Sequence, residues 1–147
     1  MLRNTFLRSA QRTAYSVPLS QHVFIHSASA LIHFILSYEA AEAELPHLLA
    51  GRDPQSRSPN EIGTHDYSRP PRAVIFGRGY EPQQVEELKK KFAGVTKEPV
   101  AWVRGNPADL PTGAAGPDYA QNIAADMKKV LKKWRDGGGK DEEILVY

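Results

Sequence analysis

Three short apolar runs alternate with two amphipathic stretches in the second half of the chain, and this alternation constrains the fold more than any other feature. The runs are "RAVIFG" (72–77), "PVAWVRG" (99–105) and "ILVY" (144–147). Apolar runs of this length are typical of strands covered on both faces, as in a parallel sheet. Residues 72–147 are therefore predicted to form a βαβαβ unit with right-handed crossovers.

The two stretches between these runs have the spacing of amphipathic helices. The first begins at Pro82, buries Val85, Leu88 and Phe92 at helical spacing, and ends at Gly94. The second runs from about 118 to 136 and has a longer apolar stripe. Its members are Tyr119, Ile123, Met127, Val130, Leu131 and Trp134. Five basic residues crowd the second half of this helix, which is typical of a solvated helix end.

A βαβαβ unit is half of a doubly wound sheet, so the fold class is α/β. We expect a small, incomplete parallel sheet that resembles Rossmann-like and flavodoxin-like folds. Three strands leave exposed edges. Residues 20–50 are therefore expected to cover one face or to add a strand, unless a second copy of the chain pairs with an edge. The alternative is a shortened version of a larger α/β protein.

The segment "HVFIHSASALIHFILSY", residues 22–38, is apolar but holds three histidines and is short for a membrane span. On a helical wheel His22, His26 and His33 share one sector, which favours a buried helix with a polar seam over a metal site. As a strand, the segment would still place His22 and His26 on one face. With "EAAEAELPHLLA" after it, the segment predicts an apolar helical extension over 21–50. The proline-rich residues 51–71 are predicted to be a linker.

The first twenty residues carry Arg3, Arg8 and Arg12 and no acidic residue. On a helix, apolar side chains would line one side and two of the arginines the other, which is typical of a mitochondrial transit peptide. We therefore expect a mitochondrial location. The alternatives are a disordered arm, which would leave the protein cytoplasmic, and membrane association through residues 1–38.

Composition narrows the class of protein further. The chain has 147 residues, 41% hydrophobic and 24% charged, which suits one soluble domain. It contains no cysteine, which excludes disulfides, thiolate zinc sites and cysteine nucleophiles. The net charge of +2 is too small an excess to argue for nucleic-acid binding.

Ligands of open parallel sheets bind beyond the carboxyl ends of the strands. The candidate ligand-binding residues after the first two strands are Gly77, Arg78, Gly79, Tyr80, Arg104 and Asn106. The first group leads directly into a helix N-terminus, where free amides and an arginine suit a phosphate or carboxylate. Structural glycines in a tight turn explain the same pattern without a ligand.

The dinucleotide fingerprint GxGxxG is incomplete here, because Pro82 stands at the third glycine position. Arg104 lies where a ribose-reading residue would stand, and an arginine there suits a 2′-phosphate. The sequence does not identify a cofactor, and NADP or another phosphate-bearing ligand is compatible with this pattern. No catalytic motif or Tyr-x-x-x-Lys pair occurs. The leading hypothesis is a small Rossmann-like protein that binds a nucleotide or another phosphate-bearing ligand. The alternative is a non-catalytic interaction module or remnant, with homodimers formed through a sheet edge or the N-terminal apolar helix.

Overall fold

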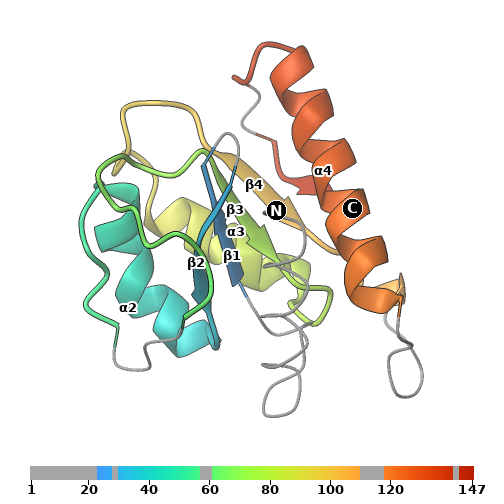
Figure 1. Cartoon of the computed structure of the whole chain (residues 1–147), viewed down its shortest axis with the longest axis horizontal. Coiled ribbons are helices and arrows are strands. Elements are labelled where there is room, and N and C mark those ends of the chain that lie inside the picture. Colours follow the sequence, from blue (N-terminus) through green and yellow to red (C-terminus); the bar gives the residue numbers. More distant parts are fainter. Residues whose placement is uncertain (1–22, 28–29, 57–60, 110–117, 141–142) are drawn as a thin grey trace.

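The computed structural model describes residues 23–27, 30–56, 61–109, 118–140 and 143–147, which form a five-stranded sheet with helices on both faces (Figure 1). The elements in chain order are β1 (Val23–His26), β2 (Leu31–Ile35), α2 (Tyr38–Leu49), β3 (Ala73–Phe76), α3 (Pro82–Lys91), β4 (Ala101–Arg104), the short 3-10 helix η2 (Pro107–Asp109), α4 (Tyr119–Asp136) and β5 (Leu145–Val146). The predicted βαβαβ order of residues 72–147 is confirmed.

The sheet has the strand order β2-β1-β3-β4-β5 and is mixed. β3, β4 and β5 are parallel, whereas β1 runs antiparallel to both of its neighbours. In the centre of the sheet Ile75 pairs with Phe24 of β1 on one side and with Val103 of β4 on the other. The α/β class is thus confirmed, with two strands more than the βαβαβ unit supplies.

Alternate side chains of the strands build two separate cores. Val23, Val74 and Trp102 face α2 and α3 on one side of the sheet. Phe24 and Ile75 face α4 on the other side. Figure 1 shows α4 standing apart from α2 and α3 across the sheet. Burial on both faces explains why the strand sequences are apolar throughout.

The prediction of a helical extension was wrong for residues 23–35, which form the hairpin of β1 and β2. Because both faces of this hairpin are buried, its strands carry apolar side chains on both faces, apart from His26 and His33. Such a run does not distinguish a helix from a strand by its period. The turn is closed by Ser27, whose amide donates to the Ala30 carbonyl oxygen at 2.9 Å. The helix begins only at α2, where the Ser37 hydroxyl accepts from the Ala40 amide at 3.1 Å. As expected, the segment adds strands and covers one face.

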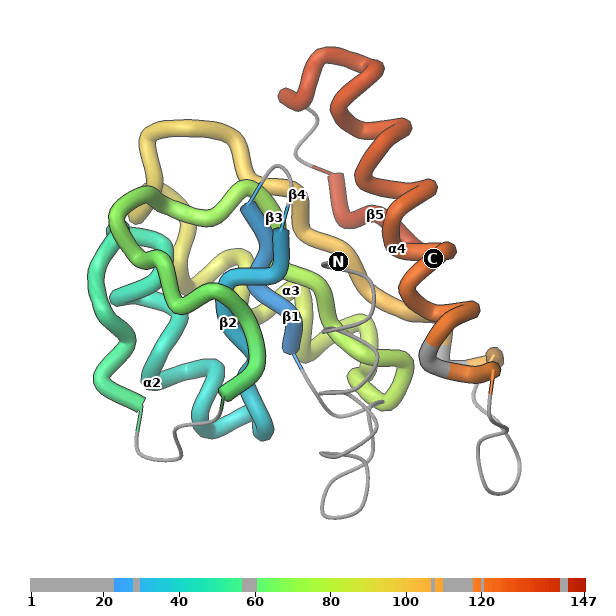
Figure 2. The backbone as a smooth tube through the Cα atoms, viewed as in Figure 1, coloured from blue at the N-terminus to red at the C-terminus, as the bar shows by residue number. Residues whose placement is uncertain are grey.

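The connection that follows α2 packs along β2, as Figure 2 shows for the green tube. The amides of Thr64 and His65 donate to the carbonyl oxygens of Leu31 and Ile32 at 3.0 and 2.9 Å. Gly63 adopts a φ of +94°, and a Cβ atom there would stand 2.3 Å from the Ile32 carbonyl oxygen. Part of the outer edge of β2 is therefore covered by residues 63–65.

The leader expected at residues 1–20 lies outside the described residues. Among the helices that the structure does describe, none combines the length and the apolar character needed to cross a membrane.

Candidate functional site

The three parallel strands end at one edge of the sheet, which we call the carboxyl edge. There β3 continues into residues 77–80 and α3, β4 continues into Gly105 and η2, and β5 is followed by Tyr147. In open α/β sheets this edge is where ligands bind. Of the six candidate residues of the sequence, Arg104 is the last residue of β4, and the other five belong to the segments that leave β3 and β4 here.

Arg78 is the central side chain of the carboxyl edge. The residue is only 8% exposed. Its Nη2 donates to Asp126 Oδ2 at 3.2 Å. Its guanidinium carbon also lies 5.1 Å from the centre of the Tyr147 ring. Arg78 thus connects the loop after β3 with α4 and with the end of β5.

Gly105 makes room for this arginine. A Cβ atom at position 105 would lie 2.2 Å from Arg78 Cγ and 2.9 Å from Arg78 Cα. The second contact is with backbone, which cannot turn away as a side chain can. Position 105 therefore needs a glycine because Arg78 packs directly against it, and not because of an unusual backbone conformation.

Tyr147 ties the ends of all three parallel strands together. Its hydroxyl donates to the Phe76 carbonyl oxygen at 2.9 Å. Its backbone amide donates to the Arg104 carbonyl oxygen at 3.0 Å, and its own carbonyl oxygen accepts from the Asn106 amide at 3.3 Å. Burial raises the pKa of the Tyr147 hydroxyl above its ordinary value, so this group remains a hydrogen-bond donor.

Two buried polar atoms at or near this edge have no hydrogen-bond partner within the described part of the chain. They are Nε of Arg78 and the hydroxyl oxygen of Tyr119, the first residue of α4. Buried donors are nearly always paired in folded proteins, because a desolvated donor without a partner is costly. The carboxyl edge therefore has unused hydrogen-bonding capacity.

The structure brings three of the six predicted residues, Arg78, Arg104 and Asn106, to the carboxyl edge as polar side chains. Arg104 Nη1 donates to the Gly105 carbonyl oxygen at 3.4 Å. Asn106 Oδ1 accepts from the Ala108 amide at 3.1 Å. Tyr80 instead lies in the core beneath α2 and α3, with its ring 5.3 Å from that of Phe76.

Gly77 and Gly79 form the turn itself, in which the Tyr80 amide donates to the Gly77 carbonyl oxygen at 3.2 Å. Neither glycine adopts a positive φ. The expected free amides at the start of α3 are partly used by the protein, because the Glu81 carboxylate and the Gln84 side chain form a capping box. An anion at this edge would therefore rely on side chains more than on the helix N-terminus.

Sequence reasoning missed Asp126 and Tyr147, the two partners of Arg78. Both are far from Arg78 in the chain, and only the crossover of α4 brings them near. One signal was available for Asp126: between Tyr119 and Arg135 it is the one acidic residue in a helix that carries many lysines.

A second polar group lies on another side of the molecule and consists of His33, Glu44 and Tyr67, here called the His33 cluster. His33 and Glu44 are 3% and 4% exposed. His33 Nε2 lies 3.4 Å from Glu44 Oε1, and His33 Nδ1 lies 2.8 Å from the Tyr67 hydroxyl oxygen. Burial, followed by the charges of Asp53 and Glu44, raises the pKa of Tyr67 to about 12, so its hydroxyl keeps its proton.

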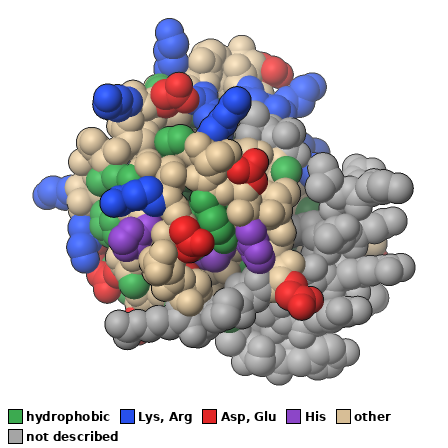
Figure 3. All heavy atoms as spheres, turned by 60° about the vertical axis from the view of Figure 1, so that its left-hand side comes forward, with side chains coloured by type: hydrophobic (Ala, Val, Ile, Leu, Met, Phe, Trp, Pro, Cys, Tyr) green, Lys and Arg blue, Asp and Glu red, His purple; other side chains and the backbone are tan. Residues whose placement is uncertain are grey.

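His65 borders the His33 cluster on the connection beside β2. Its backbone has a φ of +55°, which is uncommon for a residue other than glycine. Its ring lies 6.1 Å from that of Tyr67, with 17° between the ring planes. Figure 3, which brings α2 and this connection forward, shows histidine side chains gathered on the same face. The described residues nevertheless hold no group of three or more side chains suited to bind a metal ion.

Comparison with known proteins shows that the chain is similar in sequence to a fungal protein. No family model matches the chain. No solved structure matches it either. A curated protein of Aspergillus oryzae (strain ATCC 42149 / RIB 40), "Kojic acid related protein 6", is 30% identical over 116 residues, which cover 78% of this chain and 69% of that protein. The chain therefore belongs to the family of Kojic acid related protein 6.

Proposed function

We propose that this protein binds a small phosphate-bearing ligand, a nucleotide or a simple phosphate ester, at the carboxyl edge of the sheet. The observation that carries the proposal is the Arg78 side chain. It is only 10% exposed, yet its Nε has no hydrogen-bond partner among the described residues.

The chemistry of the guanidinium group supports an anionic ligand. A guanidinium holds its N–H donors in a planar fork that matches the oxygens of a phosphate. In Arg78 the Asp126 contact uses Nη2, and the Tyr147 ring packs against the guanidinium. A ligand oxygen at Nε would satisfy a donor whose desolvation otherwise costs about 1–3 kcal/mol. The Tyr119 hydroxyl is a second unused donor at the start of α4.

The local charges also favour an anion. Arg78 follows β3 and Arg104 is the last residue of the neighbouring parallel strand β4, so two cations reach the same edge. Asp126 is the carboxylate paired with Arg78, and its side chain is 42% exposed. Because Asp126 is already partly hydrated, exchanging it for a ligand anion requires little additional solvation. The site therefore favours a ligand with at least one phosphate or carboxylate group.

The arrangement favours a single phosphate group over a dinucleotide. The βαβαβ connectivity from β3 to β5, with its three parallel strands, supports a ligand at this edge. However, Pro82 replaces the third glycine of the fingerprint, and the capping box occupies amides of α3. The dinucleotide alternative is NADP, whose 2′-phosphate would contact Arg104. The thermal-shift screen described below therefore includes NADPH.

A thermal-shift screen of the full chain tests this function. The compounds are inorganic phosphate, ATP, FMN, NADPH and kojic acid, which the name of the relative mentions. A ligand at a hundred times its dissociation constant stabilises the native state by about 2.7 kcal/mol. For a chain of this size we expect a rise in Tm of several degrees with at least one phosphate compound.

Two substitutions locate the binding site. Arg78→Lys keeps the charge but removes the planar fork, and Arg104→Ala removes the second cation. Both should reduce the ligand-induced shift, whereas Lys129→Ala on the exposed side of α4 should leave it unchanged. The absence of a shift with every phosphate compound, or an equal shift in all three variants, would contradict the proposal.

A second candidate function, self-association, has one specific observation in its favour. β5 is the outermost strand at its side of the sheet, and Val146 within it is 46% exposed. An exposed apolar edge strand can pair with a second copy. Size-exclusion chromatography of the full chain should then show a dimer that Val146→Lys converts to a monomer. A monomer at all concentrations would remove this candidate.

We also infer mitochondrial import from residues 1–20, whose composition is that of a transit peptide. A reporter fused to residues 1–40 should be found in mitochondria. A diffuse cytoplasmic signal would remove this inference, and a signal on other membranes would favour the membrane anchor.

A further inference from the structure

A hollow lies at the end of the sheet opposite the carboxyl edge, between the C-terminal end of α3 and the start of β4. We call it the α3–β4 groove. Its volume is about 560 Å³. Sites for small molecules in proteins usually measure about 300–1,000 Å³. The groove therefore has room for a ligand of its own, independent of the proposed function.

The floor of the groove is apolar. It is formed by Phe92, Val100 and Trp102, with Leu49 and Ile144 beside them. Phe92 is 8% exposed and Val100 and Trp102 are 7% exposed, whereas neighbouring core residues are fully buried. All three side chains are thus buried, and each offers only its outer edge to the groove, where an apolar ligand group would pack against it.

The rim of the groove carries an excess of positive charge. Lys90 and Lys97 line it together with Glu86 and Glu98. The Glu98 carboxylate already pairs with Arg72, at 3.1 Å between Oε2 and Nη1. Two lysines, Lys90 and Lys97, therefore face one remaining carboxylate, that of Glu86.

We propose that the α3–β4 groove binds an anionic amphiphile, a carboxylate with an unbranched apolar tail. The tail covers the strip formed by Phe92, Val100 and Trp102, and the carboxylate lies at the rim between Lys90 and Lys97. A simple anion would make no contact with the apolar floor, and a cationic amphiphile would be repelled by the rim. Both parts of the ligand are thus needed for binding.

Trp102 makes the groove directly observable. The chain has two tryptophans, Trp102 and Trp134, so Trp134→Phe leaves a single reporter at the floor of the groove. Decanoate, kept below the concentration at which it forms micelles, should shift the Trp102 emission in a saturable way. Acetate at the same concentration and decyltrimethylammonium should not. Titration calorimetry of the unsubstituted chain with decanoate gives the same test if Trp134→Phe does not fold.

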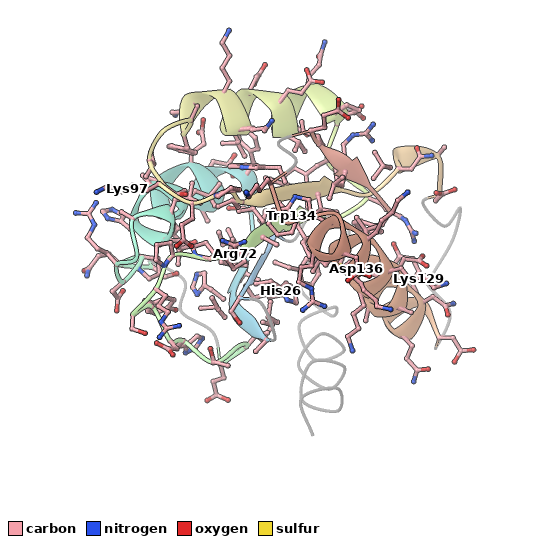
Figure 4. The ribbon with its side chains drawn as sticks, turned by 90° about the horizontal axis from the view of Figure 1, so that it is seen from above. His26, Arg72, Lys97, Lys129, Trp134 and Asp136 are labelled. Carbon is pink, nitrogen blue, oxygen red and sulfur yellow. The ribbon has the colours of Figure 1, made fainter. Side chains whose placement is uncertain are left out.

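The rim is tested by a pair of double substitutions. Lys90→Glu with Lys97→Glu should weaken decanoate binding about tenfold, because two attractions become repulsions. The matched control is Lys129→Glu with Lys132→Glu on α4, and Figure 4 shows Lys129 on the opposite side of the molecule from Lys97. This control should bind as the original chain does. An unsaturable response to decanoate, an equal response to acetate or to the cationic amphiphile, or equal weakening by the control pair would overturn the proposal.

Discussion

The Tyr67 hydroxyl oxygen lies 2.8 Å from His33 Nδ1, although the two residues are 34 positions apart in the chain. His33 is on β2, and Tyr67 is on the connection that covers part of the edge of β2. This contact therefore fastens the connection between α2 and β3 to the sheet. It also completes the His33 cluster, whose other member, Glu44, comes from α2.

Replacing Tyr67 with Phe should destabilise the protein. The change leaves the buried Nδ1 of His33 without its partner, and an unsatisfied buried group costs about 1–3 kcal/mol. Urea unfolding of the full chain measures this loss. A free energy of unfolding equal to that of the original chain would show that the contact does not fasten the connection.

Replacing Tyr119 with Phe should not destabilise the protein, in contrast to Tyr67→Phe. The Tyr119 hydroxyl is buried without a hydrogen-bond partner among the described residues. Its removal should leave the free energy of unfolding unchanged or raise it when no ligand is present. A loss as large as that of Tyr67→Phe would show that this hydroxyl has a partner in the native protein.

The pairing of His33 with Glu44 predicts strongly non-additive substitutions. His33→Leu alone leaves the Glu44 side chain without its polar neighbour at a site that is only 4% exposed, and an unsatisfied buried polar group typically costs about 1–3 kcal/mol. The double variant His33→Leu with Glu44→Leu removes both polar groups and should recover much of that loss. Urea unfolding of both single variants and the double variant completes the cycle. Additive losses would mean that the two side chains do not interact.

The fold of residues 72–147 could be predicted because each element has a distinct local pattern. The apolar runs at β3 and β4 are short and flanked by glycine or proline, and α3 and α4 have unbroken helical stripes. The hairpin of β1 and β2 could not be predicted in the same way. Its strands are buried on both faces by helices that come later in the chain, and such burial removes the alternation that marks a strand.

The candidate site was predictable in position but not in its contacts. Parallel strands must end at one edge, so the sequence positions of Arg78 and Arg104 are enough to place both residues there. The Asp126 partner of Arg78 depends on the path of α4, and Tyr80 lies in the core that faces α2 and α3. Long-range packing decides such contacts, and short sequence motifs do not encode it.

Gly105→Ala should destabilise the protein and disturb Arg78. The new Cβ atom would lie 2.9 Å from Arg78 Cα, so the backbone after β3 must move. We expect a loss of about 1–3 kcal/mol in the free energy of unfolding, as for other overpacked sites. Gly137→Ala is the matched control, since a Cβ atom there would be 3.4 Å from its nearest neighbour and φ is −80°. Equal effects of the two substitutions would contradict the close approach of Gly105 and Arg78.

His26 should make the protein less stable in acid. Burial and, to a smaller extent, the charge of Lys128 lower the pKa of His26 from 6.5 to about 4. Below pH 6.5 the His26 ring becomes protonated in the unfolded chain, whereas in the native protein it becomes protonated only near pH 4. The free energy of unfolding therefore decreases as the pH falls from 6.5 to 4, by up to about 3 kcal/mol. His26→Gln should flatten the pH dependence of the free energy of unfolding between these values. The titration of the His26 ring by NMR supplies the control, and a midpoint near 6.5 in the native protein would contradict the prediction.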